Sequence, residues 1–277
     1  MEQINEIAKQ IRKYIFKTAY FGGTGHLASA FSIVEVLSVL YFKDILKYSV
    51  DDPNWEKRDK LIMSKGHASL AMYSVLTMIG YLKEEELYTF CKPGSCLGGE
   101  PKLGDIPGIE ATTGSLGHGL SFGVGIAISN KLNNLDGKVY VILGDGECQE
   151  GSVWEAVMSA AHYKLDNLIV ILDSNKLQAM GNLNDILQLE AMRDKWSAFG
   201  WDVEEVDGHN SQEIYDAFQK NLQKKVKKPR IIIANTIKGK GVSFMENVPI
   251  WHYRMPNSDE LKIVIKELDL SEKELGL

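Results

Sequence analysis

The sequence predicts a doubly wound α/β fold, in which a parallel sheet carries helices on both faces. In the second half of the chain, continuous apolar, β-branched runs alternate with segments of helical periodicity, as in Leu168–Leu172 (LIVIL) and Arg230–Ala234 (RIIIA). Strands that are apolar at every position are buried on both faces, and helices between them indicate parallel order. The length of 277 residues is compatible with one large α/β domain. We therefore expect a single domain over 1–277, with a helical tail at 257–277.

The first half of the chain predicts helices, one strand and a long loop. Apolar residues recur at helical spacing in Ile4–Tyr20 and again, after a glycine-rich turn, in Ser32–Phe42. Lys60–Ser64 fits a short buried strand, and His67–Ile79 fits the next helix. Lys92–Gly117 holds seven glycines and three prolines with little periodicity. A loop of this length inside a compact domain is usually functional.

The second half predicts strands and helices in alternation. It begins with a helix over Leu116–Leu132, whose glycines indicate close packing against a neighbour. The predicted strands are Val139–Leu143, Leu168–Leu172, Trp201–Val206 and Arg230–Ala234, and the helices between them are Val153–Tyr163, Leu189–Phe199 and Ser211–Lys224.

The composition excludes several classes of protein. The chain has 31 Lys and Arg against 37 Asp and Glu, and this net charge of −6 disfavours binding to nucleic acid or to an anionic membrane. No apolar run approaches the roughly 20 residues that span a bilayer, and the first residues lack the apolar core of a signal peptide. The three cysteines, Cys91, Cys96 and Cys148, have no zinc-site spacing, which is typical of reduced thiols in a cytoplasmic protein.

Two predicted strands end in unusual polar sequences, and ligands of doubly wound sheets bind beyond the carboxyl ends of the strands. The first strand runs into GDGECQEG, where Gly144 and Gly146 flank Asp145, and the next strand is followed by Asn175, 30 positions later. A carboxylate, an amide oxygen and a backbone carbonyl, completed by phosphate oxygens, suit Mg²⁺. A GDG alone is a common turn. The specific indication of a metal and phosphate site is the combination of GDG after one strand with an asparagine after the next strand.

These residues resemble the signature of thiamine-diphosphate enzymes, with Ser174-Asn175 where that family often has two asparagines. Further segments resemble transketolase motifs in the same order along the chain. They are GTGHLASAFSIVEVLSVLYF (23–42), SKGHASLAMY (64–73), PGIEATTGSLGHGLS (107–121) and TIKGKGVSFMEN (236–247). The resemblance covers nearly the whole chain and is closest to the amino-terminal subunit of a split transketolase, which forms the diphosphate-binding (PP) domain.

The resemblance implies a site for thiamine diphosphate and Mg²⁺, with Ca²⁺ or Mn²⁺ as alternatives. The metal ligands would be Asp145, Asn175 and the main-chain oxygen of Leu177. The residues implied to contact the cofactor are Gly114, Ser115 and Leu116 at the aminopyrimidine, Gly146, Glu147 and Asn175 with Asp145 at the diphosphate, and His67 and His252.

The resemblance also implies catalytic histidines. His67 would reach the reacting centre, while His26 and His252 would flank the substrate hydroxyl whose proton leaves as the sugar C–C bond breaks. Neutral imidazoles with a pKa near 6.5 suit such proton transfer. Glu150 matches a carboxylate at the interface between paired subunits. The other histidines are expected to be structural, with His118 in helix packing beside His162 and His209.

In this family, a glutamate of a second, pyrimidine-binding domain acts on the aminopyrimidine of the cofactor. The chain ends at Leu277 without a segment for that domain, so we expect a carboxy-terminal partner subunit in an α2β2 assembly. The predicted activity is transfer of a two-carbon ketol unit from a ketose donor to an aldose acceptor, by a transferase active only with its partner. Two alternatives stay open: an enzyme of a specialised sugar pathway with a non-standard donor or acceptor, and a non-catalytic scaffold.

Two departures from the family pattern bear on the substrate. Glu100 stands in LGGEP, where transketolases carry a histidine that meets the sugar, and Tyr253-Arg254 follows His252 where relatives usually have glycine. One interpretation is that Glu100 merely pairs with Arg254 or Lys102. The other is that Glu100 contacts an amino-, deoxy-, nucleotide-linked or branched sugar.

Overall fold

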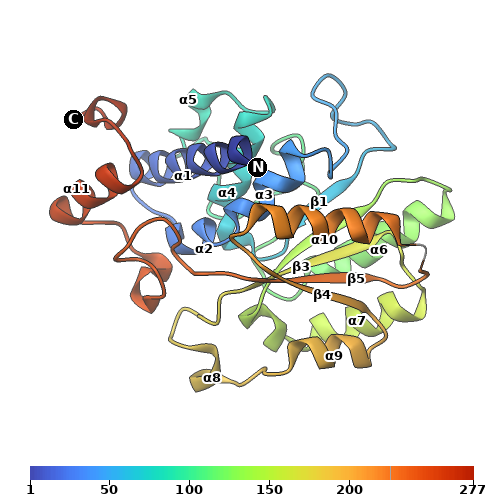
Figure 1. Ribbon diagram of the computed structural model, residues 1–277. Helices are drawn as coiled ribbons and strands as arrows, with labels where there is room; N and C mark the ends of the chain where they lie inside the picture. The colour runs from blue at the N-terminus through green and yellow to red at the C-terminus, as the bar shows by residue number, and fades with distance from the viewer. Residues whose placement is uncertain (225) are drawn as a thin grey trace.

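The computed structural model describes residues 1–224 and 226–277 and contains the predicted parallel sheet (Figure 1). Within the described residues the sheet has five strands in the order β1-β2-β3-β5-β4, and every neighbouring pair is parallel. The strands are β1 (Lys60–Met63), β2 (Val139–Gly144), β3 (Leu168–Ser174), β4 (Asp202–Asp207) and β5 (Arg230–Asn235). The doubly wound fold predicted from the sequence is therefore confirmed.

The central strands owe their sequence pattern to burial on both faces. All seven residues of β3 are buried, whereas β4 lies at the edge of the sheet and exposes part of its DVEEVD sequence. β3 runs two residues further than predicted because Asp173 and Ser174, although polar, continue the pairing with β5 and are buried. The Asp173 carboxylate accepts hydrogen bonds from Ser32 and Thr236 and pairs with Lys65, which removes the cost of burying its charge.

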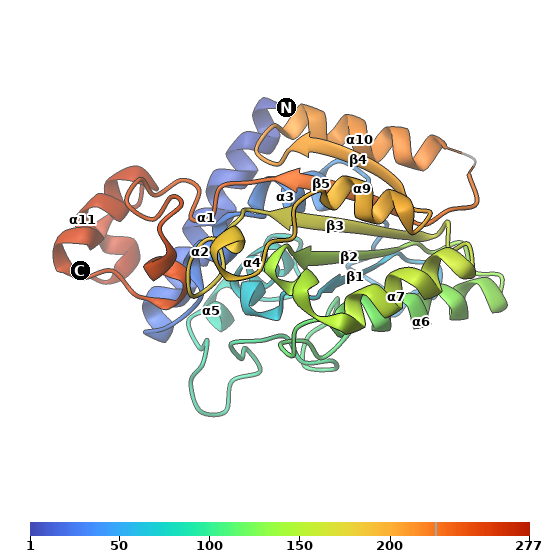
Figure 2. The ribbon, with the colours of Figure 1, turned by 90° about the horizontal axis from the view of Figure 1, so that it is seen from below.

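Helices cover both faces of the sheet (Figures 1 and 2). One core joins α1 (Glu2–Gly22), α3 (Val34–Phe42), α4 (Ser69–Met78) and α10 (Ser211–Gln223) to the sheet through residues such as Tyr140 and Ile171. The opposite core joins α6 (Gly119–Leu132), α7 (Gly151–His162) and α9 (Met192–Ala198) to the sheet through alternate residues such as Val141 and Val170. The remaining helices are α2 (Leu27–Phe31), α5 (Glu84–Leu87), α8 (Leu183–Ile186) and α11 (Ser258–Glu267), with 3₁₀ turns at Gly66–Ala68, Gly146–Gln149, Pro249–Tyr253 and Glu272–Leu275.

The long loop predicted over 92–117 contains no helix or strand. The tail holds α11 and the 3₁₀ turn at Glu272–Leu275, and its residues Val264, Leu268 and Leu275 join the same core as α1. Across the described ranges, 1–224 and 226–277, no helix combines the length and the apolar character that crossing a membrane requires.

Candidate active site

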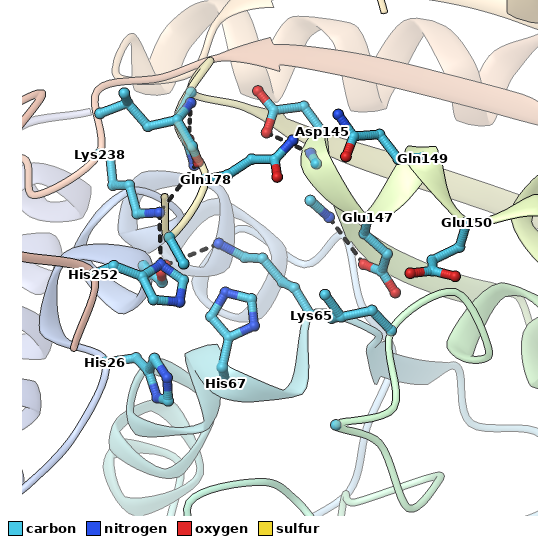
Figure 3. Close-up of a pocket in the computed structure, with 18 residues that line it drawn as sticks. His26, Lys65, His67, Asp145, Glu147, Gln149, Glu150, Gln178, Lys238 and His252 are labelled. Atoms are coloured by element: carbon cyan, nitrogen blue, oxygen red, sulfur yellow. Dashed lines mark hydrogen bonds between the residues drawn. The ribbon is translucent and has the colours of Figure 1, made fainter. Parts of the chain in front are cut away.

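A cavity of about 300 Å³ opens at the carboxyl ends of the central strands (Figure 3). Its walls come from segments far apart in the sequence, because parallel strands deliver all of their carboxyl ends to one edge of the sheet. The residues predicted from the sequence that line it are His26, His67, Gly114, Leu116, Asp145, Gly146, Glu147, Glu150, Asn175, Leu177 and His252. Ser115 and Glu100 do not line this cavity.

Asp145 and Asn175 occupy equivalent places just beyond β2 and β3. Asp145 is 2% exposed, and its carboxylate accepts hydrogen bonds from the backbone N–H groups of Gly146 (2.8 Å) and Lys176 (2.5 Å). Burial and the nearby charge of Asp173 raise the pKa of Asp145 to about 6. The amide oxygen of Asn175 accepts from the N–H of Leu177 at 3.0 Å. The two strand ends that the sequence singled out therefore face one cavity.

The metal role of these residues stays a prediction. In the described part of the chain, no group of three or more His, Cys, Asp or Glu side chains could hold a metal ion. The predicted ligand set differs from such a group, since it holds one carboxylate, one amide oxygen and one backbone carbonyl. Such a set needs oxygens from a ligand to complete the shell of a hard cation.

Lys238 is a site residue that the sequence reasoning missed. It is 2% exposed and follows β5, and its Nζ donates to the carbonyl oxygen of Leu177 at 3.2 Å. Burial and the charge of Lys65 lower the pKa of Lys238 to about 8. Lys65 also lines the cavity, so two cations face it. The sequence does place this lysine, in TIKGKG, just beyond an apolar strand. Asp145 holds the same kind of position beyond its own strand.

Three imidazoles cluster beside Lys238, across the cavity from Asp145 and Glu147 (Figure 3). The ring centroids of His26, His67 and His252 lie 5.1 to 5.3 Å apart in every pair. Burial and the charge of Lys238 lower the pKa of His26 to about 4 and that of His252 to about 3. Burial and the charge of Lys65 place the pKa of His67 well below its ordinary value. The pKa values of the three rings therefore lie below the expected value near 6.5, and the rings are neutral at physiological pH, as expected.

Glu147 anchors the glycine-rich loop instead of projecting an unpaired carboxylate into the cavity. It is 3% exposed and accepts hydrogen bonds from the hydroxyl of Ser64 and from the N–H groups of Gly117 (2.9 Å) and Gly144 (3.1 Å). These contacts tie the loop that holds Gly114 to the ends of β1 and β2. Glu150, at the start of α7, is exposed at the rim of the cavity.

Two buried polar atoms in the cavity wall test whether a polar ligand fits here. Ser29 Oγ and Gln178 Nε2 line the cavity and have no hydrogen-bond partner among the described residues. Buried polar groups are nearly always paired, and a polar ligand in the cavity would find partners in these two atoms. A side chain at Gly146 would lie 2.9 Å from Gln178 Cγ, so glycine lets Gln178 pack directly against this turn. The wall thus suits a diphosphate.

A second cavity of about 330 Å³ lies beside the first and shares His26 with it. Its lining includes Glu100 and Tyr253, whose hydroxyl lies 2.6 Å from Thr24 Oγ1 and whose ring stands 4.6 Å from that of His26.

The structure corrects one of the two interpretations of Glu100. Arg254 contacts both carboxylate oxygens of Glu260 at 2.8 Å, and Lys102 pairs with Asp105 at 3.6 Å. The predicted pairing of Glu100 with Arg254 or Lys102 is therefore wrong.

The remaining histidines lie outside both cavities. His209 hydrogen-bonds Glu35 at 3.0 Å and accepts from the N–H of Ile237, which is a structural role as predicted. His162 lies in the last turn of α7. His118, expected to pack a helix by a hydrogen bond, is exposed instead, and its ring makes no hydrogen bond to the described residues.

The fold and the strand-end cavity define a doubly wound domain that binds a ligand beyond the carboxyl ends of its strands. Residues 4–274 match the family model described as "Transketolase, thiamine diphosphate binding domain", and the chain belongs to the transketolase family. This confirms the membership that the sequence motifs predicted.

Two kinds of relative match the chain. It is 41% identical over 268 residues to one of the subunits of the apulose-4-phosphate transketolase of Phocaeicola vulgatus, covering 97% of this chain and 94% of that one. It is 41% identical over 262 residues to the 6-deoxy-6-sulfo-D-fructose transketolase subunit SqwG of a Clostridium species, covering 95% and 94%. The solved transketolase of Campylobacter jejuni superposes with a TM-score of 0.91 at 30% identity, over 99% of this chain but 45% of that one. The chain thus spans less than half of solved transketolases and nearly all of these subunits, as predicted for the amino-terminal part of a split enzyme.

Proposed function

We propose that this chain is the diphosphate-binding subunit of a two-component transketolase, which moves a two-carbon ketol unit from a ketose to an aldose. The observation that carries the proposal is the cavity at the strand ends. It combines oxygen donors (Asp145, Asn175), two unpaired buried polar atoms and three neutral imidazoles in one space. A scaffold protein has no use for this arrangement. The names of the relatives, which are transketolase subunits, support the same activity.

In this proposal the cavity holds thiamine diphosphate with Mg²⁺, or with Ca²⁺ or Mn²⁺ in its place. Asp145, Asn175 and the carbonyl oxygen of Leu177 hold the metal, and Lys238 adds positive charge for the diphosphate. When bound, the cofactor supplies the electron sink for cleaving the bond beside the carbonyl of the sugar. The further residues assigned to the cofactor are Gly146, Glu147, His67 and His252, with the backbone of Gly114, Ser115 and Leu116 beside the aminopyrimidine.

The histidines are proposed to handle the substrate proton. His26 and His252 are neutral, so each ring has one nitrogen that accepts a hydrogen bond and one that donates. A neutral imidazole beside a sugar hydroxyl can take its proton as the carbon–carbon bond breaks and return it in the reverse step.

A partner chain is proposed to complete the site. The relatives are named as subunits of their transketolases, and Glu150 is exposed at the cavity rim. Nearby surfaces of the loop, α6 and α7 expose large apolar side chains, and exposed apolar surface of this kind marks contact sites. These side chains are Leu116 (36%), Phe122 (48%) and Met158 (52%). We propose that a chain carrying the pyrimidine-binding domain covers this region in an α2β2 assembly. The three free cysteines suit a reducing compartment, the cytoplasm.

The test is a ketol-transfer screen of the two-chain complex with a panel of ketose donors and aldose acceptors. Xylulose 5-phosphate with ribose 5-phosphate serves as the reference pair. We expect transfer that requires added thiamine diphosphate and divalent metal, with one specialised donor or acceptor preferred over the reference pair. Absence of transfer with every pair, by a complex that binds the cofactor, would contradict the proposed activity.

A further inference from the structure

A buried network of three side chains, Arg12, Glu35 and His209, lies behind the carboxyl edge of the sheet; we call it the Glu35 network. Arg12 lies on α1, Glu35 lies on α3, and His209 lies between β4 and α10. Nη1 and Nη2 of Arg12 contact the two carboxylate oxygens of Glu35 at 2.7 and 2.9 Å. Nδ1 of His209 lies 3.0 Å from the same carboxylate. One buried carboxylate, in a residue that is 8% exposed, therefore joins three elements that are far apart in the sequence.

The network meets the backbone of the segment that follows β5 at two points. The N–H of Ile237 donates to Nε2 of His209 at 2.8 Å, and Nε of Arg12 donates to the carbonyl oxygen of Lys240 at 2.9 Å. Because Nε2 of the ring accepts, its proton is on Nδ1, which donates to the carboxylate. The two contacts lie on either side of Lys238, one residue before it and two residues after it.

Close packing holds the same segment. Gly241 has a φ of +100°, and a side chain there would lie only 2.9 Å from Cδ of Arg12. The N–H of Gly239 donates to the carbonyl oxygen of Ala28, on α2, at 3.0 Å. The backbone around Lys238 is therefore fixed by contacts with α1, with α2 and with the ring of His209, all of which lie outside the segment itself.

Lys238 has little freedom to correct a shift of this backbone. The residue is 2% exposed, and its Nζ lies 2.8 Å from Nδ1 of His252 and 3.2 Å from the carbonyl oxygen of Leu177 (Figure 3). Close-packed neighbours leave a buried side chain few alternative rotamers. The place of the ammonium group therefore follows the place of its backbone.

The network acts on the site through geometry and not through charge. Arg12 and Glu35 carry opposite charges and pair with each other, so together they add no net charge. None of the three side chains lines the cavity at the strand ends or the smaller cavity beside it. Any effect of the network on the site must therefore pass through the backbone of the segment that carries Lys238.

We propose that the Glu35 network is a positioning device for Lys238, and that its decisive contact is the hydrogen bond from Ile237 to His209. The proposal deepens the proposed function and rests on it in one respect, because Lys238 is taken to bind the diphosphate. Arg12, Glu35 and His209 are then positioning residues, which touch neither cofactor nor substrate.

The test replaces His209 with two amides of different length. Glutamine carries its amide near the place of Nε2, so His209→Gln can still accept from the N–H of Ile237. Asparagine reaches only the place of Nδ1, so His209→Asn keeps a donor for Glu35 but leaves Ile237 without an acceptor. Both variants keep a polar side chain, and they differ in the contact that the proposal calls decisive.

The first readout is the ¹⁵N NMR signal of His252 Nδ1 in the full chain without cofactor, because this nitrogen contacts Lys238. We expect His209→Asn to move the signal toward its position in Lys238→Met. His209→Gln should leave the signal near its wild-type position. His162→Asn, at an exposed histidine outside both cavities, is the control and should also leave it unchanged.

The second readout is the affinity of the two-chain complex for thiamine diphosphate with Mg²⁺, measured by calorimetry. His209→Asn should weaken binding by about tenfold, the effect of losing one buried hydrogen bond, and His209→Gln should stay within about threefold of the wild type. In a Lys238→Met background, His209→Asn should cause no further loss, because a residue that acts through another adds nothing once the other is removed.

A second variant covers the case in which His209→Asn does not fold, which circular dichroism checks. Arg12→Lys keeps the positive charge opposite Glu35, but a single ammonium group replaces the fork that also reaches the carbonyl oxygen of Lys240. It should move the His252 signal in the same direction.

An unchanged His252 signal in the folded variants would overturn the proposal. An equal loss of affinity from His209→Asn in the wild-type and Lys238→Met backgrounds would also overturn it, since a residue that only stabilises the fold gives this result. The NMR readout needs no cofactor, so it tests the positioning role separately from the proposed function. A complex that binds no thiamine diphosphate would contradict the proposed function, and the His252 signal would still decide whether the network positions Lys238.

Discussion

Lys238 and His252 form a direct contact at the carboxyl edge of the sheet, with Nζ 2.8 Å from Nδ1 of the imidazole. A protonated lysine can only donate, so Nδ1 of His252 accepts and its proton is on Nε2. The same ammonium donates to the carbonyl oxygen of Leu177. One buried cation therefore links the proposed metal-binding carbonyl to a histidine of the proposed substrate site, and it fixes the tautomer of that histidine.

This contact predicts the effect of Lys238→Met. Loss of the charge should raise the pKa of His252 from about 3 toward its ordinary value and weaken thiamine-diphosphate binding by at least about tenfold. NMR titration of the His252 ring and a cofactor titration of the complex measure the two effects. Lys240→Met, on the same segment, is the control and should change neither. An unaltered His252 titration in Lys238→Met would show that Lys238 does not set its protonation.

Asp145→Ala is expected to abolish metal-dependent binding of thiamine diphosphate while the fold stays intact. The residue supplies the only carboxylate of the proposed ligand set, and amide and carbonyl oxygens alone bind a hard cation weakly. Calorimetry of the complex with and without Mg²⁺ measures this, and circular dichroism checks the fold. Asp185→Ala, at an exposed site on α8, is the matched control. Unchanged cofactor affinity in Asp145→Ala would contradict the proposal that Asp145 binds the metal.

The histidine cluster makes a prediction about turnover. His26→Ala and His67→Ala should each lower turnover by roughly 10²–10⁴-fold if these rings transfer protons. His162→Ala, which lies outside the cavity, should be neutral. Near-normal turnover in both cavity variants would return these histidines to a structural role.

The same cluster predicts a pH profile. His26 and His252, with pKa values of about 4 and 3, gain a proton only in strongly acidic solution. The rate of the complex should therefore show no fall near pH 6.5 that depends on either ring. A limb near pH 6.5 in the wild type that disappears in His26→Ala would contradict the lowered pKa values.

Glu35 predicts how stability depends on pH. Burial alone would raise its pKa, but hydrogen bonds and charges from His209 and Arg12 lower it to about 2. A lowered folded-state pKa stabilises the fold fully above the ordinary value of 4.5, and this stabilisation is lost as pH falls from 4.5 toward 2. Glu35→Gln should lower the free energy of unfolding by roughly 2–4 kcal/mol at pH 7, because Arg12 loses its buried partner. The variant should also lose part of the wild type's decline in stability between pH 4.5 and pH 2.

Urea unfolding at a series of pH values tests this prediction. Glu6→Gln, at an exposed ion pair, is the control and should change the free energy of unfolding by less than about 1 kcal/mol. Equal free energies of unfolding for Glu35→Gln and wild type at pH 7 would show that the buried pair of Glu35 and Arg12 does not stabilise the fold.

The fold was predictable because its signals are local and periodic. Short β-branched runs such as LIVIL favour strands covered on both faces, and their alternation with helices indicates the parallel sheet. Short helices such as α5 and α8, with four residues each, escaped prediction because they are too short to display a helical period.

The site residues were predictable where a polar side chain comes directly after an apolar strand in the sequence, as at Asp145 and Asn175. The unpaired polar atoms of Ser29 and Gln178 could not be foreseen, since only the folded chain shows whether a buried atom has a partner. The lowered histidine pKa values depend on burial and on the charges of Lys238 and Lys65, and tertiary structure alone brings Lys238 near His26 and His67. The partner of Arg254 likewise depends on how its loop turns toward Glu260.

The central claim is that this chain supplies one half of a shared thiamine-diphosphate site. The most direct measurement is ketol transfer by the purified chain, by its partner chain and by the two mixed, each with thiamine diphosphate and Mg²⁺. We predict no turnover by either chain alone and full activity on mixing. Robust transfer by this chain alone, or no transfer by a mixture that forms a stable complex, would contradict the claim.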